Sequence, residues 1–393
     1  MKVPFFRPNI SDGEINEVVD TLRSGWLTTG PKTKEFEERF ARAVGAPHAL
    51  ALNSCTAALH LALEALGLRE GQAVVVPTMT FAATAEVVRY MNAEPLLADV
   101  HPDTLQIDLE DAERRVKESR RKVVGIMPVH IGGMMADMDR IREFAERHSL
   151  WIVEDAAHSF PSAWRKDKEE SWRWCGRGDS KVTCFSFYAN KTITTGEGGM
   201  ATTHDPELAE RMRIMSLHGI SKDAWKRFTA SGSWYYEIVA PGFKYNLTDV
   251  AASIGLHQLE RAEEFRKLRE DVARRYRSGF EGLDYLELPP SSEDRIHSWH
   301  LFYIRLRLDK LKIDRARFID LLKEMGIITS VHWMPLHLHP YYRETYGFSE
   351  GDFPEASRVW KRLISLPIFP GMKNEEVDYV IDSIRILCEK NEA

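Results

Sequence analysis

Apolar segments alternate with amphipathic helical patterns through the first half of the chain, and this alternation restricts the fold more than any other feature. We expect buried strands at residues 49–53, 73–78, 95–100, 122–130, 150–155 and 181–187. Between them, apolar residues at helical spacing with charged opposite faces predict helices at 55–66, 81–91, 109–119 and 135–148. Repeated strand–helix units predict an α/β fold, in which helices cover both faces of a mostly parallel sheet. Ligands bind such sheets at the carboxyl ends of the strands.

The pattern changes after about residue 250. Residues 251–278 predict one long amphipathic helix, because apolar side chains recur along it at helical spacing. The elements expected after it are a strand at 300–308, a helix at 314–325, a second extended segment at 328–335 and a helix at 374–389. We therefore predict a large domain over residues 1–255 and a smaller C-terminal α+β domain over residues 256–393.

Charge and cysteine content argue against several classes of protein. The chain has 53 Lys and Arg against 59 Asp and Glu, a formal net charge of -6, so no basic field attracts nucleic acid or anionic membranes. No apolar run approaches the roughly 18 residues of a membrane span, and the first residues lack an apolar signal core. The cysteines lack the spacing of a zinc site or a disulfide framework. We expect a cytoplasmic protein without nucleic-acid, membrane or metal partners.

Lys191 follows an apolar strand and precedes the glycine-rich segment Thr195-Gly196-Glu197-Gly198-Gly199, most of whose side chains are small or absent. A lysine in isolation is most often a surface charge. Here the small residues leave room for a large ligand beside the amine. A lysine that is partly removed from water has a lowered pKa and can form a Schiff base with an aldehyde.

Asp155 ends the strand expected at 150–155 and so lies at the edge of the sheet where ligands bind. Taken alone, it is equally well explained as a helix cap or a salt-bridge partner. Next to a Schiff-base lysine, a buried carboxylate can keep a pyridine nitrogen protonated. Strand alternation directs its neighbour Glu154 to the opposite side, and His158, three residues on, can donate a hydrogen bond to the same ligand.

The strand at 49–53 leads through Ser54, Cys55 and Thr56 into a helix. Serine or threonine at this place is usually an N-cap. A helix N-terminus also directs free N–H groups and a positive dipole at an anion, so one phosphate can bind without a Lys/Arg cluster. The chain has neither a GxxxxGK[ST] phosphate loop nor a GxGxxG dinucleotide motif. A kinase and an NAD-dependent enzyme are therefore disfavoured.

Several segments in this order together resemble one known family. They are residues 25–31 (GWLTTGP), 54–60 (SCTAALH), 77–81 (PTMTF), 154–158 (EDAAH), 178–187 (GDSKVTCFSF), 191–199 (KTITTGEGG) and 365–370 (SLPIFP). They are similar to motifs of the DegT/DnrJ/EryC1/StrS sugar-nucleotide aminotransferases, which use pyridoxal 5'-phosphate (PLP) and have the aspartate-aminotransferase fold, PLP fold type I. The resemblance spans nearly the whole chain and implies a seven-stranded type of sheet in the large domain.

The resemblance implies roles for single residues. Lys191 would carry PLP as a Schiff base, Asp155 would pair with the pyridine nitrogen, His158 would bond the ring oxygen and Phe81 would stack on the ring. The other residues implied near the cofactor are Ser54, Cys55, Thr56, Ala57 and Ser186, of which Thr56, Ala57 and Ser186 would hold the phosphate.

A phosphate contact from a second subunit is also implied, so we expect a homodimer with shared active sites. The family motif is G-x-N-x-R, whereas this chain has Lys244 where Asn is usual and Asn246 where Arg is usual. Which of these two side chains contacts the phosphate stays open.

The implied substrate-binding residues are Trp26, Thr29, Gly30, His332 and His337, with the aromatic and basic loop 217–237. The loop can equally be a polar surface segment. A metal site at His332, His337 and His339 lacks an evident fourth ligand, so we expect none there.

The implied reaction moves an amino group from an amino acid, with glutamate expected, to a nucleotide-linked keto-sugar. By resemblance, the segments 54–60 (SCTAALH) and 244–246 (KYN) favour C4 of a UDP- or GDP-linked 4-keto sugar; transfer to C3 is the alternative. Related dehydratases replace the lysine with histidine, and a desulfurase needs a reactive cysteine on a mobile loop. A PLP-binding regulator without turnover stays possible, although this chain has no spare segment for a DNA-binding module.

Overall fold

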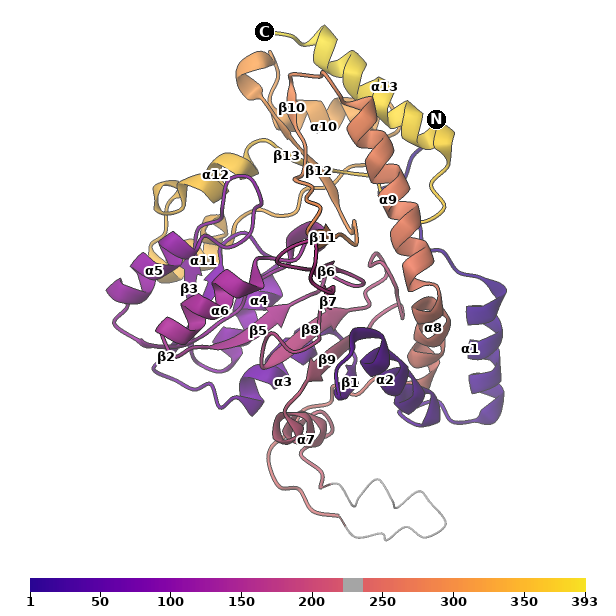
Figure 1. The fold of residues 1–393 in the computed structure, drawn as a ribbon, viewed down its shortest axis with the longest axis vertical. Coiled ribbons are helices and arrows are strands. Elements are labelled where there is room, and N and C mark those ends of the chain that lie inside the picture. The colour runs from indigo at the N-terminus through magenta and orange to yellow at the C-terminus, as the bar shows by residue number, and fades with distance from the viewer. Residues whose placement is uncertain (222–235) are drawn as a thin grey trace.

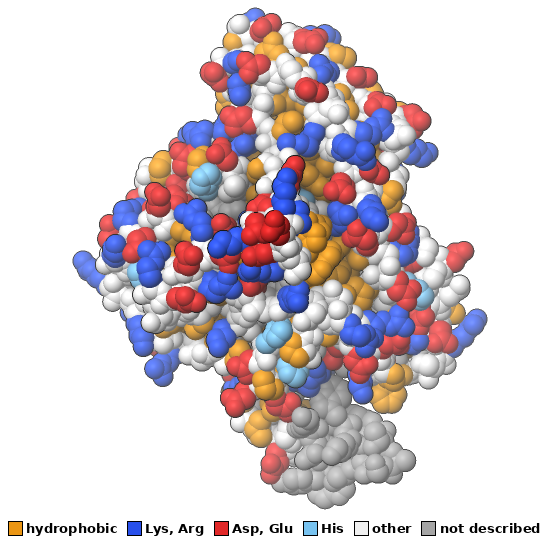
Figure 2. All heavy atoms as spheres, viewed as in Figure 1, with side chains coloured by type: hydrophobic (Ala, Val, Ile, Leu, Met, Phe, Trp, Pro, Cys, Tyr) orange, Lys and Arg blue, Asp and Glu red, His pale blue; other side chains and the backbone are white. Residues whose placement is uncertain are grey.

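The structure is a computed structural model that describes residues 1–221 and 236–393. Its centre is a seven-stranded sheet with helices on both faces, and Figure 1 shows a second body of helices and strands above this sheet, coloured orange to yellow. Acidic and basic side chains are interspersed over the face drawn in Figure 2, which agrees with the near balance of charges in the sequence. Among the described residues, no helix has the length and apolar character needed to cross a membrane.

The strands of the large sheet lie in the order β1-β9-β8-β5-β4-β2-β3. Their bounds are β1 His48–Leu52, β9 Gly199–Thr203, β8 Val182–Ser186, β5 Trp151–Asp155, β4 Lys122–Ile126, β2 Gln72–Pro77 and β3 Glu94–Ala98. The pairs from β8 to β3 are parallel, and β9 runs antiparallel to both β1 and β8. This arrangement confirms the predicted α/β fold with a mostly parallel sheet.

Two apolar clusters form on the two faces of this sheet. Val74 and Val76 of β2 belong to one cluster and Val75 belongs to the other, because successive side chains of a strand point to opposite faces. The first face is covered by α3 Cys55–Ala65, α4 Ala82–Tyr90 and α7 Pro206–Met215. The second is covered by α2 Pro31–Val44, α5 Leu109–Glu118, α6 Met138–Arg147 and α8 Asp249–Glu260. Helix α1 Asp12–Ser24 packs beside α8.

A third cluster holds together the upper body in Figure 1. Its antiparallel sheet has the order β10 Leu286–Glu287, β12 Phe302–Leu306 and β13 Leu363–Leu366. The helices in this cluster are α9 Ala262–Gly279, α10 Arg315–Glu324 and α13 Asn374–Lys390. Val3 also belongs to it, so the first residues of the chain pack beside the last helices. The division into domains of residues 1–255 and 256–393 stays a prediction.

Shorter elements connect these bodies. A small sheet joins β6 Ala163–Trp164, β7 Arg173–Trp174 and β11 Arg295–Ile296. Helices α11 Pro340–Tyr346 and α12 Pro354–Trp360 lie near the edge strand β3. Single 3-10 turns occupy Ile131–Gly133, Leu308–Lys310, Leu336–Leu338 and Glu350–Asp352.

One sequence prediction about the second half of the chain is wrong. The single helix expected at 251–278 is divided into α8 and α9 at Arg261, whose backbone is not helical (φ -96°, ψ 4°). Leu256 of α8 and Phe265 of α9 both pack in the second cluster, and α9 reaches the third cluster only from Val272 onward, so the apolar face continues across the break. The segment 328–335, expected to be extended, does not form a regular strand. It makes only an isolated bridge between Ser330 and Ser365, while the strand at this place is β13.

Candidate active site

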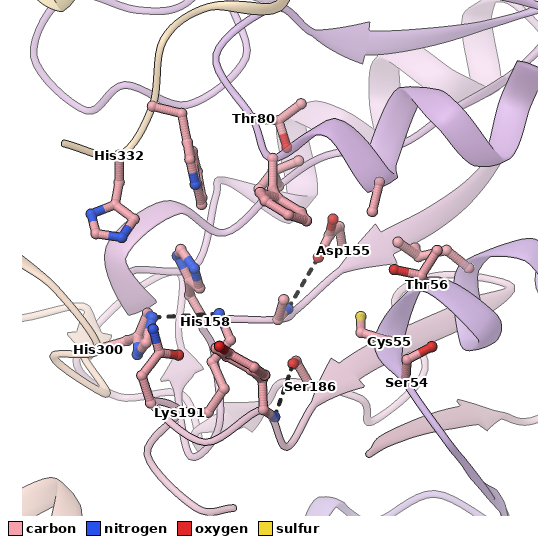
Figure 3. Close-up of a pocket in the computed structure, with 18 of the residues that line it drawn as sticks. Ser54, Cys55, Thr56, Thr80, Asp155, His158, Ser186, Lys191, His300 and His332 are labelled. Carbon is pink, nitrogen blue, oxygen red and sulfur yellow. Dashed lines mark hydrogen bonds between the residues drawn. The ribbon is translucent and has the colours of Figure 1, made fainter. Parts of the chain in front are cut away.

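A cavity of about 310 Å³ lies at the carboxyl ends of β5 and β8, beside the first residues of α3 and α4. Its volume is sufficient for a small cofactor. It is therefore at the sheet edge where the sequence predicts a ligand site. The predicted site residues that line it are Ser54, Cys55, Thr56, Phe81, Asp155, His158, Ser186, Lys191 and His332, and most of these are labelled in Figure 3.

Lys191 lies in the turn after β8, where its N–H donates to the carbonyl of Tyr188 at 2.9 Å. Its Nζ lies 3.5 Å from Nε2 of His300. Burial lowers the pKa of the Lys191 amine to about 8, against the opposing effects of Cys55 and Asp155. An amine with this pKa has an appreciable neutral, nucleophilic fraction near neutral pH.

Asp155 is the last residue of β5, and its carboxylate is buried beside the cavity. The Thr84 hydroxyl donates to Oδ2 at 2.7 Å, and the Ala157 N–H donates to Oδ1 at 3.1 Å. Thr84 is in turn bonded to the hydroxyl of Thr80 at 2.7 Å. Burial raises the pKa of Asp155, while the bonds from Thr84 and Ala157 and the charge of Lys191 oppose the rise. The carboxylate is thus fixed in direction.

Glu154 points away from the cavity, as strand alternation predicts. Its carboxylate accepts hydrogen bonds from Ser180 at 2.6 Å and Thr183 at 2.9 Å and lies 2.8 Å from Nε2 of His130. Burial acts to raise the pKa of Glu154, but His130 and the hydroxyls outweigh it and the pKa is lowered. Nδ1 of His130 accepts from the Ala136 N–H at 3.1 Å, so Nε2 carries the proton donated to Glu154.

His130, Glu154 and Cys175 are the described residues whose ligand atoms lie within 4.8 Å of one another, close enough to hold a metal ion. The hydrogen bond between His130 and Glu154 accounts for two of these three atoms. His332 and His339 bond instead to Ser365 and to the Met334 carbonyl.

The His158 ring is held by its neighbours in the wall of the cavity. Nδ1 accepts a hydrogen bond from the Gly132 N–H at 3.2 Å, so the proton of the neutral ring lies on Nε2. Trp333 stacks on the ring at 5.0 Å and 23°, and His300 packs against it at 4.1 Å. Burial holds the pKa of His158 well below its ordinary value. His158 is therefore a neutral donor.

The N-terminus of α3 faces the same cavity. Ser54 is its N-cap, and the Ser54 hydroxyl accepts from the Ala57 N–H at 3.0 Å. Strand β9 passes very close, since a Cβ on Gly199 would lie 2.4 Å from the Ser54 carbonyl carbon. A residue larger than glycine would displace this helix start. Ser186 lies opposite, where its hydroxyl accepts from the Tyr188 N–H at 3.3 Å.

Ala57 does not line the cavity, and a group of five further predicted residues lies outside the cavity that a single chain forms. Lys244 Nζ donates to Asn246 Oδ1 at 2.5 Å, and Asn246 Nδ2 donates to the Thr29 hydroxyl at 2.7 Å. Gly30 N–H donates to Asp249 at 2.7 Å, and Trp26 is 42% exposed. Lys244, Asn246 and the segment 26–30 are therefore brought together, but apart from Lys191.

The structure does not bring His337 to the cavity. Its side chain is fully buried, with Nδ1 2.8 Å from the Thr78 hydroxyl and Nε2 2.9 Å from the Ser357 hydroxyl. Both ring nitrogens are thus within hydrogen-bond distance of hydroxyls inside the fold, which does not support a substrate-binding role.

Of the predicted substrate loop 217–237, residues 222–235 lie outside the described residues.

Sequence reasoning missed several residues of the cavity. They are Thr80, Tyr188, Asn190, Glu197, His300 and Trp333, together with Thr84 behind Asp155. His300 precedes β12 and Trp333 lies in an irregular segment, so both reach the cavity from parts of the chain that are distant in sequence. The sequence contains one local indication that each residue belongs to the site. His300 begins the apolar run 300–308, and Trp333 adjoins the predicted site residue His332.

Comparisons with known proteins agree with this geometry. The model of the DegT/DnrJ/EryC1/StrS aminotransferase family matches residues 8–385. The chain is 45% identical to the spore coat polysaccharide biosynthesis protein SpsC of Bacillus subtilis, over 98% of this chain and 96% of SpsC. It is 46% identical to a protein of Methanocaldococcus jannaschii, over 99% of this chain and 98% of that protein.

Solved structures are similar over the same length. The PMP form of Spr1654 from Streptococcus pneumoniae, described as a sugar aminotransferase, superposes with a TM-score of 0.91 at 36% identity, covering 99% of this chain and 100% of that one. DesV of S. venezuelae superposes with a TM-score of 0.88 at 32% identity, covering 99% of each chain. The chain therefore belongs to the DegT/DnrJ/EryC1/StrS aminotransferase family.

Proposed function

We propose that this protein transfers an amino group from glutamate to C4 of a nucleotide-linked 4-keto sugar, with PLP bound in the cavity around Lys191. The observation that carries the proposal is the convergence of Lys191, Asp155 and the N-terminus of α3 on one cavity. Family membership makes the chain an aminotransferase that uses PLP and acts on a sugar. The SpsC relative supports an amino-sugar product that enters a polysaccharide.

The residues around the cavity fit PLP. A lysine of lowered pKa suits the aldehyde, a buried carboxylate suits the pyridine nitrogen, and a helix start suits the phosphate. Gly199 keeps this helix start close to β9. Because the Ala57 N–H is already bonded to Ser54, we assign the phosphate to the backbone around Thr56 and to the Ser186 hydroxyl.

PLP supplies an aldehyde carbon and a ring that delocalises the electron pair left when a Cα proton is removed. Lys191 would bind the aldehyde at rest and, once released by the amino donor, would move the proton from Cα as general base and acid. Asp155 would hold a proton on the ring nitrogen, in the direction that Thr84 and Ala157 impose. The Nε2–H of His158 would donate to the ring oxygen, and Phe81 would cover the ring.

The chain's second phosphate contact is proposed to come from a partner subunit. Lys244 and Asn246 lie together at the surface but outside the cavity of their own chain, with Trp26 and Thr29 beside them. In a homodimer with shared active sites, these residues would complete the cavity of the other protomer. The keto-sugar nucleotide would then be bound between Trp26, Thr29 and Gly30 of one subunit and His332 of the other.

Two measurements test the proposal. Glutamate added to the purified holoenzyme should remove the near-visible absorbance of the PLP–Lys191 linkage and release 2-oxoglutarate. A regulator without turnover would release none. The enzyme loaded with the amino group should then be mixed with UDP- and GDP-linked 4-keto and 3-keto sugars. We expect amino-sugar formation from a 4-keto sugar, and formation from 3-keto sugars alone would contradict the C4 assignment.

A further inference from the structure

The imidazole of His300 lies beside the Lys191 amine, and none of the sequence motifs accounts for it. Nε2 of His300 is 3.5 Å from Nζ of Lys191, which is longer than an ordinary hydrogen bond of about 3 Å, and the contact is drawn in Figure 3. We propose that His300 is a positioning residue that accepts a hydrogen bond from Nζ and so directs the free amine toward the substrate carbon. This inference rests on the proposed function, in which that amine moves the proton.

The backbone that carries His300 is held on both sides. Arg269 of α9 donates from Nη1 to the carbonyls of Trp299 at 3.3 Å, His300 at 3.4 Å and Ile368 at 2.8 Å. The Leu301 N–H donates to the Gly132 carbonyl at 3.1 Å. The His300 ring packs on His158 and is 4% exposed. A ring held in this way can fix the direction of a flexible lysine side chain.

The protonation of His300 follows from its surroundings. Burial holds the pKa of His300 well below its ordinary value, and the charges of Lys191 and Arg269 act in the same direction, so the ring is neutral. Its Nδ1 is buried and has no hydrogen-bond partner among the described residues. An ammonium has donors only, so a protonated Lys191 requires Nε2 to be the acceptor and Nδ1 to carry the proton.

Lys191 also interacts electrostatically with ionisable groups from several other elements. These groups are Cys55, Asp155, His158, Arg269 and His332. The hydrogen bond that the described residues provide to Nζ is the one to His300. A free amine can rotate about its last side-chain bond, and one hydrogen bond removes that freedom. Such orientation of a reacting group raises the rate without a change in its chemistry.

The first test uses the cofactor-free protein and is independent of turnover. Lys191 is labelled with acetic anhydride over a series of pH values, and the modified fraction is read by mass spectrometry. In the unchanged protein the labelling midpoint should be near pH 8. Because the bond to Nε2 favours the charged amine, His300→Leu should move the midpoint lower by about half a pH unit or more. The amide oxygen of His300→Gln can accept the hydrogen bond, so this variant should keep the labelling midpoint of the unchanged protein.

The matched control is His297→Leu, which removes another buried histidine of the same segment. His297 stacks on Trp299 at 3.9 Å and accepts from the Trp299 N–H, away from Lys191. Its replacement should leave the labelling midpoint unchanged. Thermal melting shows whether His300→Leu folds. If it does not, His300→Phe takes its place in the comparison, because phenylalanine keeps an aromatic ring but has no hydrogen-bond acceptor.

The second test measures the half-reaction with glutamate in the holoenzyme. His300→Leu should slow the proton transfer by about tenfold or more with unchanged glutamate affinity, whereas His300→Gln should stay within about threefold of the unchanged enzyme. An unchanged midpoint in His300→Leu, or a Gln variant as slow as the Leu variant, would overturn the inference. Absence of any half-reaction in the unchanged enzyme would refute the proposed function instead, and the labelling midpoint would still decide the role of His300.

Discussion

The hydroxyl of Thr84 and the carboxylate of Asp155, 71 residues apart in the chain, are joined by a buried hydrogen bond of 2.7 Å. The bond connects the first turn of α4 to the end of β5 and fixes the carboxylate at the cavity. It is worth more than a neutral hydrogen bond because the acceptor is charged.

Thr84→Val removes this bond with little change in volume. We expect the pKa of Asp155 to rise further, since the Thr84 bond opposes the effect of burial, and PLP to bind about tenfold more weakly. Absorbance titration of the cofactor-free protein with PLP measures the affinity. Thr183→Val, which removes a bond to Glu154 on the other side of the strand, is the control and should leave the PLP affinity unchanged. Equal loss in both variants would contradict the assignment.

Lys191→Ala should abolish turnover and the near-visible absorbance of the bound cofactor, because no other described lysine lines the cavity. The physical reason is the loss of both the bond to PLP and the amine that moves the proton. Lys181→Ala, at an exposed lysine before β8, should retain both properties. A Lys191→Ala variant that turns over at the normal rate would contradict the assignment of Lys191 as the residue that binds PLP.

The uptake of PLP by the cofactor-free protein should depend on pH through Lys191. Burial lowers the pKa of this amine to about 8, and only the neutral amine attacks an aldehyde. The uptake rate should therefore rise with pH and become constant above about pH 8, as followed by stopped-flow absorbance. A rise that continues to the ordinary lysine pKa near 10.5 would show that burial does not act in this way.

Glu154→Ala should lower the free energy of unfolding by about 3 kcal/mol, because it removes one partner of a buried, hydrogen-bonded pair. Glu118→Ala, in the exposed pair with Arg114, should change it by less than about 1 kcal/mol. Urea denaturation measures both. Since the pKa of Glu154 is lowered by folding, its contribution is present above the unfolded pKa near 4.5 and is lost as the pH falls through the folded value. A difference from the unchanged protein that persists undiminished at lower pH would contradict this linkage.

Mixed dimers test whether the active sites are shared. A Lys191→Ala protein and a Lys244→Ala, Asn246→Ala protein should each be inactive alone. After unfolding and refolding together in equal amounts, half of the dimers would contain one intact site, which gives roughly a quarter of the original activity. No recovery, with both proteins dimeric by light scattering, would place Lys244 and Asn246 outside the partner's site.

Much of the fold could be predicted because its elements have local signals. The strands β1 to β5 and the helices between them were expected within a few residues of their bounds, since burial on both faces requires continuous apolar runs. The division at Arg261 had no such signal. Leu256 before the break and Ala262 after it pack in the same cluster, so the apolar pattern continues across Arg261 and does not mark the end of a helix.

The sequence by itself determined the α/β class and the segments that carry Lys191, Asp155 and the start of α3, because motif and strand-end position are local properties. Only the tertiary structure decided what surrounds them. Thr84 reaches Asp155 from the next layer, His300 reaches Lys191 from the region of β12, and His337 turns into the fold instead of the cavity. These contacts depend on packing between segments distant along the chain, whose relative placement no local pattern encodes.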